Sequence, residues 1–369
     1  MVAVHQFIPT FAPRDAIGTH ALHAQRILRD MGVASDIYAD GFRGAKAGQV
    51  RSFRSFARRS RGSGEPAWLM YQLSTGSAVF DFLMARPEPK LVNYHNITDP
   101  SLYRAWEPGV AIELGEGQRQ MRELAPTVEL GIAVSEFNRA GLEAAGYART
   151  TVSPVLVDLE EGRVSPDPAT TRALVKAKNG GGADWLFVGR VAPHKCQHDV
   201  VRAFAAYRAA YDPRARLHLV GGTGSHAYLV TLERYVAGLG LAGAVTMAGS
   251  VRQSVLAAVY RNADVFVCLS EHEGFCVPIV EAMRERVPVV AFAAAAVPET
   301  VAGAAVLLSV KDPMTVAAAV HRVLSDGVLR DQLADAGVGR AGHFTLERAS
   351  RRFRTVMEEL LQGAEAGCA

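Results

Sequence analysis

The chain has 369 residues, of which 49% are hydrophobic and 21% charged, with a formal net charge of +3. This length exceeds the size at which one core stops growing, so two domains are expected. The charge is too small to argue for nucleic acid, and no nucleic acid partner is expected. Four cysteines without a C-x-x-C pair favour a reduced, cytoplasmic location. The longest apolar region, 287–309, is interrupted by two prolines and a glutamate, which excludes a membrane span there.

Short apolar runs separated by helical segments occupy the first half of the chain. The first run reads as a strand rather than a signal peptide. A helix is predicted over 19–31, and Gly32 ends it. The strands are predicted at 2–9, 33–38, 68–72, 90–93 and 130–134. This alternation is typical of a parallel sheet covered by helices.

The same rhythm restarts after a stretch near 158–179 that loses it. A helix is expected from about residue 199, and 346–361 reads as a charged amphipathic helix. Strands are predicted at 185–188, 217–220, 245–247, 265–269 and 287–292. The chain is therefore predicted to be α/β, with two Rossmann-like doubly wound domains. A ligand is expected at the carboxyl ends of the strands, in a cleft between the domains.

The most informative segment is 271–283, Glu-His-Glu-Gly-Phe-Cys-Val-Pro-Ile-Val-Glu-Ala-Met. It follows an apolar strand, and Pro278 is well placed as the first residue of a helix. One carboxylate, Glu273, lies in the loop, and a second, Glu281, lies early in the helix. A helix start attracts anions through its free N–H groups and dipole. A phosphate flanked by two hydroxyl-binding carboxylates would suit a nucleotide sugar.

A second motif, residues 189–195, follows another strand. Gly189 lets the backbone approach a ligand closely. Arg190 and Lys195 add a planar fork and a point charge, both of which suit a diphosphate. Taken alone, Arg190 and Lys195 would be interpreted as surface cations on a loop. A diphosphate at the helix start in 271–283, however, would need such positive charges opposite that helix start.

These motifs together resemble the retaining nucleotide-sugar glycosyltransferases of GT-B architecture, family 4 (group 1). The residues that carry the resemblance, in the family's order, are Phe187–Arg190 with Lys195, Leu219–Gly222, Ala248–Val251, Tyr260–Val267 and Glu273–Met283. The resemblance implies an acceptor-binding domain over 1–155, a linker region over 156–180 and a nucleotide-sugar domain over 181–345. The C-terminal helix and tail, 346–369, would pack back towards the N-terminal domain.

The resemblance also implies a role for each matched residue. Arg190 and Lys195 would bind the diphosphate, Glu281 the ribose hydroxyls and Glu273 the sugar hydroxyls. Catalytic roles are thus expected for His95, Arg190, Lys195 and Glu273. The remaining donor-binding residues are Gly18, Gly189, Gly222, Val251, Gly274, Phe275, Cys276 and Val277. Gly18 would lie under the diphosphate, and Val251 would pack on the base. Cys276 stands where the family commonly has glycine, and Gly18 is single where many members have a pair.

Other chemistries fit the sequence less well. A hydrolase pair is disfavoured because nearby cations would lower the pKa of both carboxylates. The sequence contains no Asp-x-Asp, so neither a metal nor another cofactor is expected, and a UDP-sugar is slightly preferred over a GDP-sugar. The pairs His20/His23 and His194/His198 fit packed or solvated histidines better than metal ligands. An epimerase of the same architecture, or a non-catalytic nucleotide-sugar-binding protein, remains as an alternative.

Residues 42–61 are rich in arginine, with Phe53 and Phe56 interleaved. Such a run is usually a solvated face. It would also suit peripheral contact with an anionic membrane or with a phosphorylated acceptor. The acceptor is expected to be a small natural product or a precursor of an envelope glycan or lipid.

Overall fold

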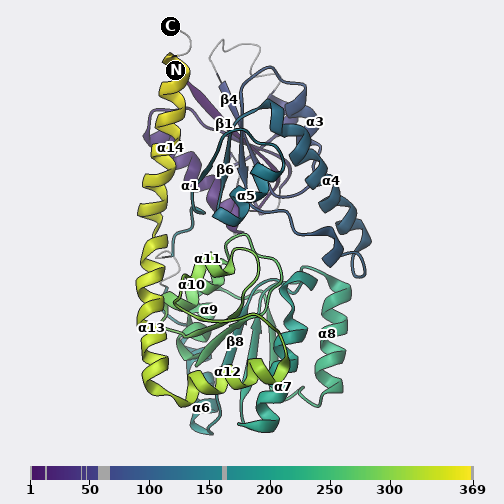
Figure 1. Cartoon of the computed structure of the whole chain (residues 1–369), viewed down its shortest axis with the longest axis vertical. Coiled ribbons are helices and arrows are strands. Elements are labelled where there is room, and N and C mark those ends of the chain that lie inside the picture. The colour runs from purple at the N-terminus through teal and green to yellow at the C-terminus, as the bar shows by residue number, and fades with distance from the viewer. Residues whose placement is uncertain are drawn as a thin grey trace. The chain divides into compact units, whose positions relative to one another are not determined.

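The computed structural model describes residues 2–12, 15–42, 44–46, 48–56, 67–159 and 164–366. The chain forms two compact units. The first comprises residues 1–100, 109–158 and 345–369, and the second comprises residues 101–108 and 159–344. Each unit holds one parallel β-sheet with helices packed on it (Figure 1).

The first unit has a seven-stranded sheet in the order β3-β2-β1-β4-β5-β6-β7. Its strands are β1 (Ala3–Phe11), β2 (Ile37–Phe42), β3 (Arg51–Ser52), β4 (Ala67–Leu73), β5 (Lys90–Tyr94), β6 (Val128–Ala133) and β7 (Thr150–Val152). Its helices are α1 (Ala16–Asp30), α3 (Val79–Met84), α4 (Pro108–Leu124), α5 (Glu136–Ala144) and α14 (Leu346–Ala366). The strand order reverses direction between β1 and β4, which is where a doubly wound sheet opens a binding crevice.

The second unit has a six-stranded sheet in the order β10-β9-β8-β11-β12-β13. Its strands are β8 (Asp184–Val188), β9 (Arg216–Val220), β10 (Val245–Gly249), β11 (Val265–Cys268), β12 (Val289–Phe292) and β13 (Val306–Leu308). Its helices are α6 (Pro168–Asn179), α7 (Gln197–Ala210), α8 (His226–Gly238), α9 (Gln253–Asn262), α10 (Val277–Arg284), α11 (Val297–Val301), α12 (Pro313–Ser325) and α13 (Gly327–Ala341). Here the order reverses between β8 and β11. The prediction of two doubly wound α/β domains is confirmed.

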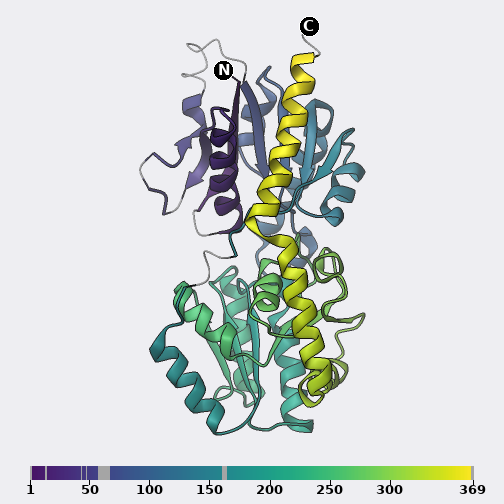
Figure 2. The ribbon, with the colours of Figure 1, turned by 90° about the vertical axis from the view of Figure 1, so that its left-hand side faces the viewer.

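Helix α14 packs on the first unit, as expected, although it follows the last helices of the second unit in sequence. Its apolar stripe joins the core formed by the sheet and α1, and Figures 1 and 2 both show it beside α1. The buried side chains of the stripe are Ala349, Phe353, Val356, Met357 and Leu360. Their spacing of three and four residues keeps them on one helix face, so the helix buries that face against the unit.

Two expected elements differ from the structure. The strand predicted at 33–38 begins only at Ile37. Ala34 already forms a parallel bridge with Ala3, but the Asp36 N–H donates to the His5 side chain at 3.2 Å rather than to a strand carbonyl. The stretch near 158–179, where the pattern was lost, contains α6. That helix starts with Asp167, whose carboxylate caps the Thr170 N–H at 2.8 Å, and it has no fully buried residue. A helix without a buried face leaves little apolar periodicity to detect.

Candidate functional site

The predicted donor residues of the second unit gather at one edge of its sheet. Gly189 follows β8, Gly222 follows β9, Val251 follows β10 and Glu273 follows β11. All these strands are parallel, so their carboxyl ends lie on the same edge. The loops after β8 and β11 flank the point where the strand order reverses, which is the usual ligand position in such a sheet.

Lys195 and Glu273 form the central ion pair of this edge. The Lys195 ammonium donates to both carboxylate oxygens of Glu273, at 2.7 and 2.8 Å. The two side chains are only 17% and 8% exposed. Burial alone would lower the pKa of Lys195, but the Glu273 charge outweighs it and the net effect raises the pKa. Lys195 is therefore held charged in a poorly hydrated position, where a charge acts strongly on a ligand.

The loop that carries Glu273 is held by backbone contacts on both sides. The Glu271 N–H donates to the His194 carbonyl at 2.9 Å, which ties this loop to the loop of Lys195. On the other side, the Glu273 carbonyl accepts from the Ala296 N–H at 3.2 Å and the Phe275 carbonyl accepts from the Thr300 hydroxyl at 2.5 Å. The carboxylate is thus positioned by its backbone as well as by Lys195.

A second lysine ties the same two loops together. Lys311 donates to Asp199 at 2.7 Å and to Glu271 at 2.5 Å, and its Nζ lies 3.5 Å from the Cys196 sulfur. Burial would lower the pKa of Lys311, but its two carboxylate partners outweigh burial and raise it. No motif pointed to Lys311, because its partners lie 40 and more than 100 residues away in sequence.

Helix α10 starts beside Glu273. It begins at Val277, one residue before the predicted start, so Pro278 is its second residue. Cys276 is the N-cap, with a left-handed backbone of φ 69° and ψ 65°. The first amides of a helix have no acceptor within it, and the helix dipole adds partial positive charge beside them.

Glu281 lies one turn into α10 and is held by an aromatic hydroxyl. Tyr260 of α9 donates to its carboxylate at 2.8 Å. Burial raises the pKa of Glu281, and the Tyr260 hydrogen bond only partly opposes this effect. The expectation that nearby cations would lower the pKa of both carboxylates is therefore wrong for Glu281. The family resemblance includes Tyr260 among its matched residues but implied no role for it.

Glycines let the loops after β8 and β9 approach each other. A Cβ on Gly221, which has φ 149°, would lie 2.0 Å from the Gly189 carbonyl oxygen. A Cβ on Gly222 would lie 2.5 Å from the Ser250 hydroxyl. The backbone that precedes exposed Arg190 therefore depends on the absence of a side chain at Gly221.

Replacing Gly221 with alanine should destabilise the protein by about 2–5 kcal/mol, combining the positive φ with overpacking. Urea unfolding measures this change. Gly339→Ala is the matched control, since a Cβ there meets nothing within 4 Å inside α13. It should leave stability unchanged or raise it by about 1 kcal/mol. Equal urea midpoints for Gly221→Ala and Gly339→Ala would contradict the close approach of Gly221 to the Gly189 carbonyl.

His95 and Gly18 lie in the first unit, near the carboxyl edge of its sheet. Gly18 is the third residue of α1, and its N–H donates to the Asp15 carboxylate at 2.6 Å. A Cβ there would lie 1.9 Å from the Ala12 carbonyl oxygen. Gly18 is thus required for α1 to pack on the end of β1. This packing explains the glycine at position 18 without any ligand.

His95 follows β5 and ends a chain of buried amide side chains. Gln6 donates to the Ala21 carbonyl at 3.0 Å, and Gln72 donates to the Gln6 side-chain oxygen at 2.7 Å. The Gln72 oxygen then faces the His95 Nε2 at 2.6 Å, so His95 must be the donor. Burial lowers the pKa of His95 to about 3. His95 is therefore neutral near pH 7, with its proton on Nε2 and a lone pair on Nδ1.

Gln72→Leu should remove the preference of His95 for the Nε2–H tautomer, because it removes the oxygen that accepts the His95 hydrogen bond. Nitrogen chemical shifts of labelled histidine distinguish the two tautomers. Gln120→Leu is the control: Gln120 is also buried but hydrogen-bonds Ser77. We expect a mixture of the two His95 tautomers in Gln72→Leu and the Nε2–H tautomer alone in Gln120→Leu. An unchanged Nε2–H form in Gln72→Leu would contradict the relay.

The basic segment 42–61 is only partly within the described residues; Arg43, Arg58, Arg59 and Arg61 lie outside them. The interleaved aromatics Phe53 and Phe56 are buried in the first unit. Phe56 packs edge-on against Phe7 and Tyr38. These two rings are core residues, so they supply no apolar face to a membrane.

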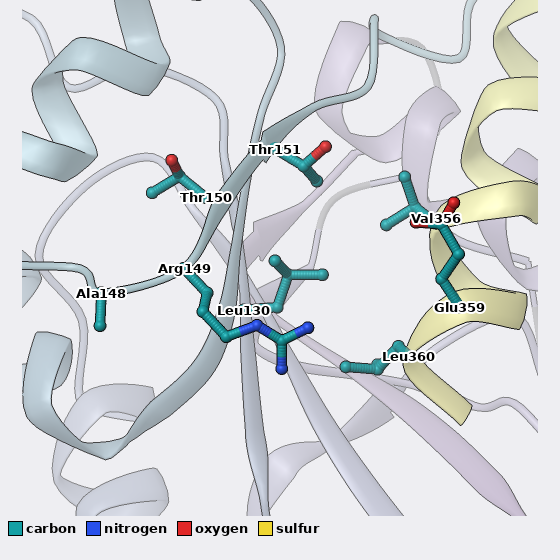
Figure 3. A pocket seen from close by; sticks show the side chains of 8 residues that line it. All are labelled: Leu130, Ala148, Arg149, Thr150, Thr151, Val356, Glu359 and Leu360. Carbon is teal, nitrogen blue, oxygen red and sulfur yellow. The ribbon is translucent and has the colours of Figure 1, made fainter. Parts of the chain in front are cut away.

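A hollow of about 420 Å³ lies elsewhere in the first unit, between the edge of its sheet and α14 (Figure 3). Figure 3 shows Arg149 extending from the β7 side toward the helix. Its lining residues are Leu130, Ala148, Arg149, Thr150, Thr151, Val356, Glu359 and Leu360. None of the predicted site residues is among them.

Known proteins resemble this chain in sequence and fold. The family described as "Glycosyl transferases group 1" matches residues 175–339. The D-inositol 3-phosphate glycosyltransferase of Geodermatophilus obscurus is 38% identical over 54% of this chain and 45% of its own. A GDP-mannose-dependent alpha-(1-6)-phosphatidylinositol monomannoside mannosyltransferase of Mycolicibacterium smegmatis is 29% identical over 66% of this chain and 64% of its own.

A solved structure shares the fold over almost the whole chain. Anabaena HepE in complex with UDP and glucose has a TM-score of 0.77 and 16% identity, and covers 97% of this chain and 100% of its own. The aligned part of this chain spans about half the length of the curated relatives. The family match, residues 175–339, lies in the unit that contains Lys195, Glu273 and Glu281.

Proposed function

We propose that the chain transfers a sugar from a nucleoside diphosphate sugar to an acceptor hydroxyl, with retention of anomeric configuration and without a metal. The premise is the match of residues 175–339 to the family described as "Glycosyl transferases group 1". The observation that carries the proposal is the buried Lys195–Glu273 pair beside the start of α10, with Glu281 one turn into that helix.

The donor is held by groups that match its parts. Lys195 and the exposed Arg190 bind the diphosphate, and the first amides of α10 share its negative charge. Glu281 accepts from the ribose hydroxyls, and Glu273 accepts from hydroxyls of the sugar. Val251 packs on the base. His95, with a lone pair on Nδ1, accepts a hydrogen bond from a sugar hydroxyl.

The reaction exchanges one bond at the anomeric carbon. The bond from that carbon to the diphosphate oxygen breaks, and the acceptor oxygen bonds to the same face. The acceptor hydroxyl gives its proton to the departing phosphate oxygen. Negative charge grows on the leaving diphosphate, so Lys195, Arg190 and the α10 amides stabilise the transition state more than the bound donor. None of these groups serves as a covalent nucleophile.

The acceptor is proposed to carry a phosphorylated polyol. Two of the relatives have names that contain D-inositol 3-phosphate and phosphatidylinositol monomannoside, and both groups include a phosphorylated polyol. The first unit, with His95 at its sheet edge, is the proposed acceptor domain. Among the described residues, no helix is both long and apolar enough to cross a membrane. Catalysis in the cytoplasm, at the membrane surface if the acceptor is a lipid, completes the proposal.

The test incubates the protein with UDP-glucose or GDP-mannose and with inositol phosphate or phosphatidylinositol. Products are followed by mass spectrometry and their anomeric configuration by NMR. Retained configuration, with activity that survives chelation of divalent ions, supports the proposal. Inverted product or loss of activity on chelation contradicts the stated mechanism. Donor binding without transfer to any acceptor contradicts the proposed activity, and sugar conversion with donor alone indicates an epimerase.

A further inference from the structure

Two thiols lie beside the carboxylate of the Lys195–Glu273 pair. Cys268 ends β11, and Cys276 caps α10. The sulfurs of these residues and a Glu273 oxygen all lie within 4.8 Å of one another, and all three residues are buried. The Cys268 thiol also donates to the Ser270 hydroxyl at 3.4 Å. The donor site of this chain therefore contains a soft ligand set.

Two thiolates and a carboxylate match a thiophilic divalent cation such as Zn²⁺. We propose that Cys268, Glu273 and Cys276 bind such a cation, and that its occupancy excludes the sugar donor. Two sulfurs and one oxygen give three ligands and leave one position open. The second half of the proposal rests on the proposed function, since it assigns Glu273 to the donor.

Charge balance favours this site despite its burial. Without metal, two neutral thiols, the Glu273 carboxylate and the Lys195 ammonium sum to zero. When the cation binds, the two thiols release their protons to solvent, and the two new negative charges offset the two positive charges of the ion. The site is again neutral, so the cost of burying uncompensated charge is avoided. Lys195 loses its direct hold on Glu273, because the cation takes a carboxylate oxygen.

A neighbouring cluster shows what distinguishes this site. Cys196, Asp199 and Glu271 also lie within 4.8 Å of one another. Lys311 already contacts all three of these residues. That cluster has one thiol, and burial raises the pKa of Cys196 to about 12. With a single thiol it is a poorer match for a thiophilic cation, so we expect no metal there, and Cys196 provides a matched control.

The experiment titrates the reduced full-length protein with Cd²⁺ and follows thiolate-to-metal charge-transfer absorption. One equivalent should bind, and Zn²⁺ should displace it. Cys268→Ser and Cys276→Gly should each weaken binding by at least about 100-fold, since loss of even an outer contact costs 10–100-fold. Glycine suits position 276 because the backbone there has φ 69°. Cys196→Ser should bind as wild type. Loss of binding only in Cys196→Ser, or no charge transfer in wild type, overturns the metal site.

A second arm tests donor exclusion. Affinity for Cd²⁺ should rise with pH, because two protons are released. A nucleoside diphosphate sugar that binds the protein should weaken Cd²⁺ binding in proportion to its own occupancy. Simultaneous binding of both overturns the exclusion. If no nucleotide sugar binds at all, the proposed function fails while the charge-transfer result still decides the metal site.

Discussion

Lys195→Met should lower kcat/KM for sugar transfer by about 10²–10³-fold, the usual effect of removing one group that stabilises transition-state charge. Lys195 is the buried cation of the site, and methionine keeps much of its apolar stem. The loss should appear mainly in kcat, because charge on the leaving diphosphate grows in the transition state. Steady-state kinetics with a saturating acceptor measures it.

This variant also leaves Glu273 as a buried carboxylate without its partner, which costs about 3–5 kcal/mol of stability. The double variant Lys195→Met/Glu273→Gln removes both charges and should recover much of that loss. Its activity should stay low. If activity returned with stability, Lys195 would act only as a structural partner of Glu273. Wild-type kinetics in Lys195→Met would exclude it from the reaction.

Glu281→Gln should weaken nucleoside diphosphate binding by about 10–100-fold, because hydroxyl bonds to a charged acceptor are worth about 1.5–3 kcal/mol. The same change should raise thermal stability near pH 7. Burial raises the pKa of Glu281, so the folded protein holds its proton more tightly than the unfolded chain. Its contribution to stability is therefore present at low pH and lost as pH rises through the folded-state pKa.

Binding and stability thus change in opposite directions, which separates a ribose contact from a folding defect. The gain in stability should vanish below the pKa of an unfolded glutamate, where both states are protonated. Glu285→Gln serves as the control at the C-terminal end of the same helix, since Glu285 caps α10 and pairs with Arg261 and Arg284. It should not weaken nucleotide binding. Equal loss in both variants would refute the role of Glu281.

Much of this architecture was predictable because strands and glycines are local signals. Short apolar runs ended at glycines or polar loops, and most of the predicted strands lie within two residues of the observed ones. The gathering of the candidate donor residues of the second unit at one sheet edge was predictable for a related reason. Loops that follow parallel strands share one edge, so Gly189 and Glu273 could be brought together without knowing the packing.

The remaining features depend on contacts that no local pattern records. Lys311 reaches Asp199 and Glu271 only after the chain has folded. The relay from Gln6 through Gln72 to His95 joins three strands, and each glutamine alone is an ordinary polar residue. The raised pKa of Glu281 also escaped prediction, because it arises from burial among residues distant in sequence rather than from the nearby cations.

The central claim is that the carboxyl edge of the second sheet binds a nucleoside diphosphate. Isothermal titration of the protein with UDP and with GDP tests it most directly. At least one should bind at a single site, and the affinity should fall in Lys195→Met/Glu273→Gln and in Glu281→Gln while Glu285→Gln binds as wild type. Binding that is equal in all four proteins, or absent for both nucleotides in the wild type, would contradict the account.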